Sequence, residues 1–558
     1  MSGAGYLGTG RDLFAIQDLP QGTPSGTAVL LCPPFGWEAL AARRALRRWG
    51  RLLAGDGHLA VRIDLPGTGD SPGSPHDPGL LTQWVAALAD AAAVLAGTDG
   101  VQSVAALGLG LGGLLALEAV RAGAPFDELA LWATPRNGRR AIRELQAFAA
   151  FEELPQPDDG GLLAGGYLMT AETRAQVALI DPAQWHGHTL DRRRVLLLGR
   201  DGDPEPAFGI ALERAGGTVS AAAAGGYGAM TGLQTFGALP QEPARRVASW
   251  LSRPGTGRRP QVALRTQAAM AAGAVTVTER PVALPVGDGR TLFAVRTDPA
   301  GAPATRTVVF LNAGRLDHTG PNRLWVELAR GAAAAGVAAL RLDGAGIGES
   351  GGDDDPSDDP PALFAEHHID DLVAALAAAD GTAVCLVGLC SGGAWALRAG
   401  ARVPAVDTVV AINPRAILEP DARAHAEAAR RVTRVTERRA WRHLWRDRRL
   451  VPRLVLATLV GLVRHGWDLV SGGPRRRTRE VDAMLDTLAA RGATVVFAFS
   501  GSEPLDDDYR QEGRWAALGR WPGVRRVSLD LGRERHELRP LALQRRAHEL
   551  VGPLAAPR

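Results

Sequence analysis

The chain has 558 residues, of which 46% are hydrophobic and 22% are charged, and its formal net charge is +3. This length exceeds the roughly 250–300 residues that one hydrophobic core usually serves, and the composition excludes long disorder and fibrous classes of protein. The net charge is too small and too evenly spread to predict a nucleic-acid partner.

The N-terminal residues and the cysteines predict a cytoplasmic protein. The start of the chain lacks the basic and apolar regions of a secretory signal, and the longest strongly apolar stretch, 454–463, is far shorter than the roughly 20 residues of a membrane span. The three cysteines, Cys32, Cys385 and Cys390, match neither a disulfide framework nor a zinc motif. We therefore expect no metal, and we expect no organic cofactor because no glycine-rich loop has a phosphate-binding context.

An internal repeat with a period near 279 residues relates the two halves of the chain. Three segments of the first half recur in the second: residues 10–16 as 289–295, 29–31 as 308–310, and 64–71 as 343–350. Each half alternates short β-branched runs with longer segments of helical period, which is typical of a mostly parallel sheet covered by helices. The sequence therefore predicts two homologous α/β domains.

The first domain is assigned to residues 1–252. Its residues 108–113 read Gly-Leu-Gly-Leu-Gly-Gly after a predicted strand, so they superficially resemble a dinucleotide-binding loop. Asp203 follows a later strand, and residues 211–260 contain no histidine. We interpret the Gly-rich segment and Asp203 below, by comparison with the equivalent residues of the second half.

A stretch rich in Pro, Gly and Arg, residues 253–260, has no structural period and is typical of a linker. We assign residues 253–274 to a linker and 275–558 to the second domain. Strands are predicted in the second domain near residues 308–312, 338–343, 383–388, 407–413, 493–499 and 524–530.

Cys390 stands in a Gly-x-nucleophile-x-Gly pattern, Gly-Leu-Cys-Ser-Gly, between a predicted strand and a helical segment. The central residue of such a turn is strained, and glycines at the flanks avoid clashes with neighbouring backbone. The turn also directs the free N–H groups and the positive dipole end of the helix at the thiol, which lowers a thiol pKa and helps to bind an oxyanion. The alternative is a buried structural cysteine, an interpretation that suits Cys385 and Cys32 better.

The chain resembles the α/β-hydrolase superfamily, and within it the serine-aminopeptidase-like branch that includes exosortase-associated hydrolases. The resemblance covers nearly the whole chain and is carried by residues 312–322, the loop 343–350, the turn at Cys390 and residues 536–540. It implies two tandem α/β-hydrolase domains. Most members have serine as the nucleophile, and the cysteine is a departure shared with some dienelactone hydrolases and polyester synthases.

The resemblance also implies where the acid and the base lie, because in this fold the acid follows the penultimate strand and the histidine follows the last one. Glu503 occupies the acid position, with Asp506 as the reserve candidate. His536 stands after the last predicted strand and is the expected base. An ordinary surface histidine is the alternative for His536.

Aligned by the repeat, Gly110 of the first half takes the position of Cys390, and Asp203 takes that of Glu503. Glycine supplies neither oxygen nor sulfur, so the first half cannot form a covalent acyl intermediate. We interpret it as a pseudo-hydrolase domain.

An oxyanion site is expected from backbone N–H groups of Ser391 and of the loop at Ala313 and Gly314. His318 lies in the same loop. Contact with substrate and local hydrogen bonding are both considered for its side chain.

An arginine-rich segment lies where α/β-hydrolases insert a lid, and we assign a helical lid to about residues 415–490. Between Arg415 and Arg464 there are 13 arginines against five acidic residues, a local balance of +8. Such charge runs are usually solvated surface. The sharper interpretation is a lid that meets an acidic carrier protein or makes weak contact with a membrane surface.

These residues predict a hydrolase or acyltransferase for an ester, thioester or amide, with a small-molecule acyl substrate that is free or bound to a carrier protein. Cys390 would attack a carbonyl carbon after His536, oriented by Glu503, takes the thiol proton, and an acyl-enzyme thioester would form. The alternative is a binding or scaffold protein in which both turns are vestigial.

Overall fold

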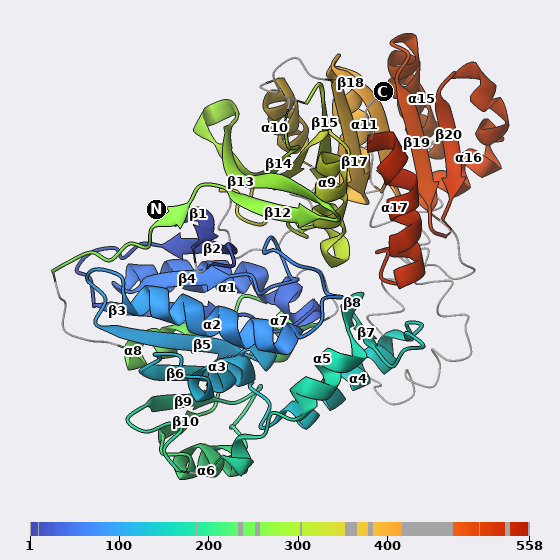
Figure 1. The fold of residues 1–558 in the computed structure, drawn as a ribbon. Helices are drawn as coiled ribbons and strands as arrows, with labels where there is room; N and C mark the ends of the chain where they lie inside the picture. Colours follow the sequence, from blue (N-terminus) through green and yellow to red (C-terminus); the bar gives the residue numbers. More distant parts are fainter. Residues whose placement is uncertain are drawn as a thin grey trace.

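The structure is a computed structural model that describes residues 2–8, 10–185, 187–232, 238–251, 257–301, 304–351, 365–377, 383–415, 473–501, 503–529 and 536–555. The described residues form two nine-stranded sheets and a small hairpin (Figure 1). Residues 416–472, most of the predicted lid, lie outside the described residues. The surface predicted to meet a carrier protein or a membrane belongs to this segment, so it also lies outside the described residues.

The first sheet joins six parallel strands to three antiparallel strands at one edge, in the order β10-β9-β6-β5-β3-β4-β2-β1-β11. Its strands are β1 (Ser2–Leu7), β2 (Leu13–Asp18), β3 (Thr27–Cys32), β4 (Leu59–Ile63), β5 (Ser103–Leu109), β6 (Glu128–Trp132), β9 (Arg194–Leu198), β10 (Thr218–Ala222) and β11 (Leu264–Arg265). Alternate residues of a strand point to opposite faces. In β3, Val29 and Leu31 contact one helix layer whereas Leu30 and Cys32 contact the other, so residues 28–32 of the strand are all apolar.

Helices cover both faces of the first sheet. One face packs against α1 (Trp37–Gly55), α7 (Tyr227–Thr231) and α8 (Glu242–Trp250), and the other packs against α2 (Leu80–Ala96), α3 (Leu111–Arg121) and α6 (Pro206–Arg214). Between β6 and β9 the chain inserts α4 (Gly138–Glu152), the hairpin β7 (Leu162–Ala164) and β8 (Tyr167–Met169), and α5 (Ala171–Ala178). This insertion projects from the body of the first half (Figure 1).

The second sheet repeats this arrangement, in the order β12-β13-β14-β16-β15-β17-β18-β19-β20. Its strands are β12 (Ala268–Ala272), β13 (Val275–Pro285), β14 (Thr291–Asp298), β15 (Arg306–Leu311), β16 (Ala338–Leu342), β17 (Ala383–Leu389), β18 (Val406–Ile412), β19 (Thr494–Phe499) and β20 (Val524–Ser528). Each of the six strands predicted from sequence is present, and β16 to β20 are parallel neighbours of β15 or of one another. The prediction of two α/β units is confirmed.

The helices of the second half also lie on both faces of their sheet. One face carries α9 (Leu324–Ala334) and α17 (Leu541–Ala555), and the other carries α10 (Glu366–Ala377), α11 (Ser391–Arg402), α15 (Gly473–Ala490) and α16 (Pro504–Gln511). The predicted lid, 415–490, is wrong for its last part, because α15 belongs to the body of the fold. Val481, Leu485 and Leu488 of α15 are fully buried against the sheet.

The two halves repeat the same hydrogen bonds at equivalent serines. Ser71 accepts the N–H of Phe14 at 2.9 Å and donates to a carbonyl at the end of β4, and Ser350 does the same for Phe293 at 2.8 Å. The two serine-containing loops, residues 64–71 and 343–350, therefore adopt the same conformation for the same reason.

The predicted linker, residues 253–274, contributes to both sheets. β11 pairs with the edge strand β1 of the first sheet, and β12 pairs with β13 of the second. Ala268 and Met270 of β12 are buried in an apolar cluster that also contains Tyr6 and Phe14 of the first half. The two halves are thus joined by shared core and not only by a tether.

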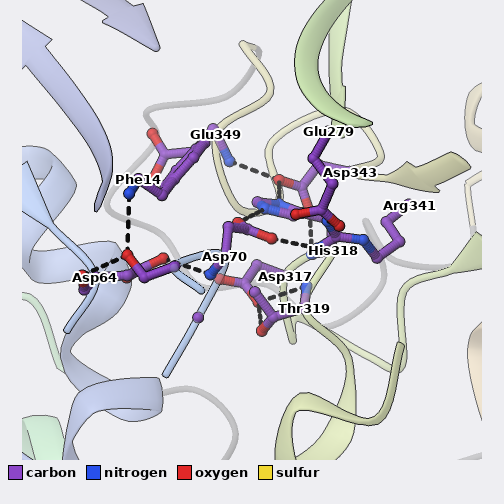
Figure 2. Close-up of polar contacts among 12 residues, drawn as sticks. Phe14, Asp64, Asp70, Glu279, Asp317, His318, Thr319, Arg341, Asp343 and Glu349 are labelled. Atoms are coloured by element: carbon purple, nitrogen blue, oxygen red, sulfur yellow. Dashed lines mark hydrogen bonds and ion pairs between the residues drawn. The ribbon is translucent and has the colours of Figure 1, made fainter. Parts of the chain in front are cut away.

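Ion pairs join the halves in a reciprocal pattern. Arg62 of the first half binds Glu349 of the second through two hydrogen bonds of 2.7 and 3.0 Å, and Arg341 of the second half binds Asp70 of the first. Each residue lies 279 positions from its counterpart, as in an interface between two copies related by a two-fold axis. The halves therefore pack as a pseudo-symmetric pair, and Figure 2 shows Asp70 of the first half among His318, Arg341 and Asp343 of the second.

Within the described residues, no helix combines the length and the apolar character that crossing a membrane requires.

Candidate functional site

Cys390 occupies a sharp turn between β17 and α11, with φ 60° and ψ −118°. Its N–H donates to the carbonyl of Ile412 at 3.0 Å, which ties the turn to the neighbouring strand β18. A Cβ added to Gly388 or Gly392 would overlap backbone atoms, so the glycines at both flanks are required. A positive φ on a residue with a side chain is strain of the kind found at functional sites.

Glu503 and His536 converge on Cys390 from the loops that follow β19 and β20. Nδ1 of His536 lies 2.7 Å from Oε1 of Glu503. Nε2 of His536 forms no hydrogen bond with the described residues, and the ring lies close enough to the Cys390 thiol for each group to shift the pKa of the other. The structure thus brings together the three side chains that the sequence pattern assigned as nucleophile, acid and base.

Asp506, the reserve candidate for the acid, belongs to a different cluster. Its carboxylate accepts hydrogen bonds from Arg526 at 2.6 and 2.8 Å and from Arg510 at 2.6 Å, and it is fully buried. These ion pairs stabilise the fold around α16, whereas the carboxylate beside His536 is that of Glu503.

The electrostatics of the three groups favour a thiolate beside an imidazolium. Burial acts to raise the pKa of Cys390, but the positive charge of His536 outweighs it and the thiol pKa falls below its ordinary value. Burial acts to lower the pKa of His536, but the Cys390 thiolate and the Glu503 carboxylate raise it to about 9. The pKa of Glu503 is lowered despite its burial, chiefly by the hydrogen bond from His536. Each charge stabilises the next one along the row.

Asn413 is a site residue that the sequence analysis missed. It directly follows β18, and its Nδ2 donates to the carbonyl of His536 at 2.9 Å and to Oγ of Ser500 at 2.7 Å. Its Oδ1 accepts the N–H of Ser500 at 2.9 Å. One fully buried amide therefore joins the acid loop to the histidine loop. The sequence did offer one signal, an asparagine directly after an apolar strand. Asparagine adopts positive φ more readily than most residues, and Asn413 has φ 43°.

Arg415 was assigned to the start of the lid, but its side chain belongs to the site. Its guanidinium donates to Oε2 of Glu503 at 2.9 Å and to Oε1 at 3.4 Å. It also acts to lower the pKa of Cys390. Arg415 therefore fixes the carboxylate that orients His536.

The predicted oxyanion groups lie next to the turn. The N–H of Gly314 donates to Oγ of Ser391 at 2.9 Å, so the loop after β15 is bound directly to the first residue of α11. The N–H of Ser391 acts to lower the pKa of Cys390, as a donor close to the sulfur does. Ala313 is buried in the same apolar cluster against which Cys390 packs.

The substrate contact considered for His318 is wrong, because its side chain is fully buried between the two halves. Its Nε2 lies 2.6 Å from Oδ2 of Asp70, and its Nδ1 lies 2.7 Å from Oδ2 of Asp343 (Figure 2). Burial acts to lower the pKa of His318, but the two carboxylates raise it well above its ordinary value. His318 is a charged bridge in the interface, and sequence alone could not place Asp70 beside it.

The first half keeps the turn but fills the place of the nucleophile. Gly110 has φ 50° and ψ −125°, close to the angles of Cys390. A Cβ added there would lie 2.5 Å from the hydroxyl oxygen of Tyr227 and 2.9 Å from the Glu38 carboxylate. Tyr227 begins α7, which follows the last parallel strand of its sheet as His536 follows β20, and it donates to Glu38 at 2.9 Å. The space for a nucleophile is therefore occupied by a different polar pair.

Beside this pair lies a cavity of about 330 Å³. Its walls are mostly apolar, its charged groups are Glu38, Glu144 and Arg200, and Thr231 also lines it. Arg200 donates to Glu38 at 3.1 Å and to Glu144 at 3.4 Å. The charged side chains of this cavity are thus paired with one another.

Replacing Gly110 with serine is expected to create no esterase activity in a chain that also carries Cys390→Ala. The new side chain would meet Tyr227 and Glu38, and we expect the free energy of unfolding to fall by about 2–4 kcal/mol from overpacking and strain. Urea denaturation and turnover of a p-nitrophenyl ester measure the two effects. Activity gained by this variant, or unchanged stability, would show that the space at Gly110 is open.

No group of three or more His, Cys, Asp or Glu side chains able to hold a metal ion occurs among the described residues.

Comparisons with known proteins gave matches only among solved structures, since no family model and no curated protein matches the chain. A dienelactone hydrolase from Anabaena variabilis ATCC 29413 is 17% identical with a TM-score of 0.31, and the match covers 50% of this chain and 96% of that one. A proline iminopeptidase from Mycobacterium smegmatis is 16% identical with a TM-score of 0.32, covering 49% and 97%. An esterase from Pyrococcus furiosus is 14% identical with a TM-score of 0.31, covering 49% and 89%.

Proposed function

We propose that this chain, in which two halves of the α/β-hydrolase fold pack against each other, is an acyl hydrolase or acyltransferase that acts through a covalent thioester on Cys390. One observation carries the proposal: a strained cysteine, a histidine and a carboxylate from three separate loops meet in one chain of interactions. The substrate class is an ester, a thioester or an amide, as a small molecule or on a carrier protein.

The first stage transfers the acyl group to sulfur. With the thiol proton on His536, the thiolate of Cys390 attacks the carbonyl carbon, a C–S bond forms, and the π electrons of the carbonyl move to its oxygen. The N–H of Ser391 and the N–H of Ala313 are the expected donors to this oxyanion, because the N–H of Gly314 is held by Oγ of Ser391. When the adduct collapses, the bond to the leaving group breaks and Nε2–H of His536 protonates that group.

The second stage releases the acyl group. Water, for hydrolysis, or an acceptor nucleophile, for transfer, gives a proton to the now neutral His536 and attacks the thioester carbonyl. The C–S bond then breaks, and the thiolate and the imidazolium are restored. Because a thioester reacts with amines and thiols more readily than an oxygen ester does, a cysteine nucleophile favours transfer as well as hydrolysis.

A binding or scaffold function is the second candidate, and the first half is the observation that favours it. There Tyr227 and Glu38 fill the position of the nucleophile while the turn keeps its shape. The lineage therefore tolerates loss of chemistry in a stable fold. In the second half the corresponding space holds Cys390 beside His536, which favours the enzymatic function.

Labelling with iodoacetamide, followed by intact mass and peptide mapping from pH 5 to 9, tests the proposal. We expect one rapid label on Cys390, with a rate that stays high below pH 8.5, because the pKa of this thiol is lowered from its ordinary value of about 8.5. In His536→Ala the thiol loses its positive neighbour and burial dominates, so the profile should move to higher pH.

Cys32 and Cys385 are internal controls for this experiment, because both are fully buried and burial alone raises the pKa of Cys32. They should label only on unfolding. Acyl transfer from an alkyl ester or an amide, whose leaving group must take up a proton, should fall again above about pH 9, where His536 loses the proton that it gives to that group. If Cys390 labels no faster than the two buried cysteines, the binding function replaces the enzymatic one.

A further inference from the structure

The loop between β15 and α9, residues 312–323, lies directly against the turn that carries Cys390. The N–H of Gly314 donates to Oγ of Ser391, and a Cβ on Gly392 would overlap the carbonyl oxygen of Asn312. We call residues 312–323 the β15–α9 loop. Any shift of this loop therefore moves backbone N–H groups relative to the sulfur.

The outer side of the β15–α9 loop is bound to the first half by charged side chains. Oδ2 of Asp317 lies 2.6 Å from Nε of Arg43, which belongs to α1. The next residue, His318, reaches Asp70 at 2.6 Å (Figure 2). Asp317 and His318 are almost completely buried, so both interactions are shielded from water and from salt.

The end of the β15–α9 loop is fixed to the first half in a third place. The guanidinium of Arg323 donates to the carbonyl oxygens of Gly69, Ser71 and Gly73, at 2.9, 3.0 and 3.0 Å. These three acceptors belong to the turn that follows β4. A buried guanidinium with three backbone acceptors holds two loops in one relative position.

Within the second half the same loop is held from the inner side by one carboxylate. Oδ1 of Asp343 accepts the N–H of His318 at 2.6 Å and Nδ2 of Asn312 at 3.0 Å, and its Oδ2 binds the His318 ring. The imidazolium of His318 thus lies between Asp343 of the second half and Asp70 of the first. The position of the loop is decided jointly by the two halves.

We propose that the first half, which lacks a nucleophile of its own, positions the β15–α9 loop against Cys390 and so completes the oxyanion site of the second half. This inference rests on the proposed function. Arg43 is a positioning residue that acts through Asp317, three residues along the chain from Gly314.

Two reactions of Cys390 separate this role from the reactivity of the thiol. Acylation by p-nitrophenyl acetate places negative charge on a carbonyl oxygen, which the loop must stabilise, before p-nitrophenolate leaves. Alkylation by iodoacetamide forms the C–S bond as iodide leaves and places no such charge on an oxygen. A displaced loop should therefore slow acylation and leave alkylation unchanged, because oxyanion donors act only on the charge that develops in the transition state.

The experiment compares two variants of the full chain that each remove one ion pair between the halves. Arg43→Gln removes the pair with Asp317 in the β15–α9 loop, whereas Arg62→Gln removes the pair with Glu349, which lies outside that loop. Burst kinetics should show about a tenfold lower acylation rate for Arg43→Gln, since small misplacements of catalytic groups cost that much or more. Arg62→Gln should acylate as the wild type does, and both variants should alkylate at the wild-type rate.

Asp317→Asn provides a second variant that keeps the shape of the side chain, and Arg43→Lys should restore part of the acylation rate. The double variant of Arg43→Gln and Asp317→Asn should be no slower than either single one, because the two residues act as a pair. Equal losses in Arg43→Gln and Arg62→Gln, or no loss in Arg43→Gln, would overturn the inference while leaving the proposed function intact. A wild-type Cys390 that neither acylates nor alkylates selectively would overturn both.

Discussion

Replacing Cys390 with alanine is expected to lower kcat/KM for a p-nitrophenyl ester by about 10⁴-fold or more, because the proposed thioester can no longer form and only binding and oxyanion contacts remain. His536 and Glu503 would remain in the site, but a general base without the nucleophile that it activates contributes little to the rate. Steady-state kinetics and the absence of an acyl adduct in the intact mass measure the result.

Cys385→Ala is the matched control for this prediction, because Cys385 is a fully buried cysteine of β17, the strand that leads to Cys390, five residues earlier. It should keep kcat/KM within about twofold while losing about 1 kcal/mol of stability from the cavity that it leaves. Cys390→Ser should lose about 10²-fold or more, since a hydroxyl does not ionise beside His536 as a thiol does. A serine variant with full activity and the same adduct would remove the case for sulfur, and an active alanine variant would place the reaction elsewhere.

Replacing Asp70 with alanine is expected to lower the free energy of unfolding by about 3–5 kcal/mol, because it leaves the buried cations His318 and Arg341 without their shared carboxylate. Urea denaturation followed by tryptophan fluorescence measures this loss. Asp90→Ala is the control, since it removes a surface ion pair with Arg11 and should change stability by less than about 0.5 kcal/mol.

The same variant should change the response of stability to pH. The pKa of Asp70 is held well below its ordinary value by Arg341 and His318 despite its burial, so its contribution is present above about pH 4 and is lost as the pH falls below that. The pKa of His318 is raised, so its contribution is complete below about pH 6.5 and is lost only as the pH rises through the raised value. Asp70→Ala should therefore flatten the acid side of the stability profile, and a variant as stable as the wild type would contradict the charged bridge.

The alternation of strands and helices was predictable because it depends on local periodicity. All six strands expected in the second half lie within one or two residues of their predicted bounds. The antiparallel strands β13 and β14 were not predicted, since such partly exposed strands are defined more by pairing with their neighbours than by their own pattern. For the same reason the linker gave no sign that β11 and β12 would complete two sheets.

The three residues of the candidate site were predictable because each stands at a fixed position relative to a strand. Cys390, Glu503 and His536 follow β17, β19 and β20, and parallel strands bring their carboxyl ends to one edge. Asn413 and Arg415 were not predicted as site residues. Their contacts with the His536 carbonyl and the Glu503 carboxylate depend on which groups the fold places around them.

The sequence by itself determined that the chain contains two related α/β units, that one turn carries a cysteine and that the other carries glycine, because these are properties of local pattern and of residue type. Only the tertiary structure decided that Tyr227 and Glu38 fill the empty turn, that Glu503 rather than Asp506 meets His536, and that His318 bridges the halves. The physical reason is that hydrogen bonds and ion pairs act over about 3 Å. Partners such as Asp70 and His318 lie 248 residues apart in the chain, and only packing brings them within that distance.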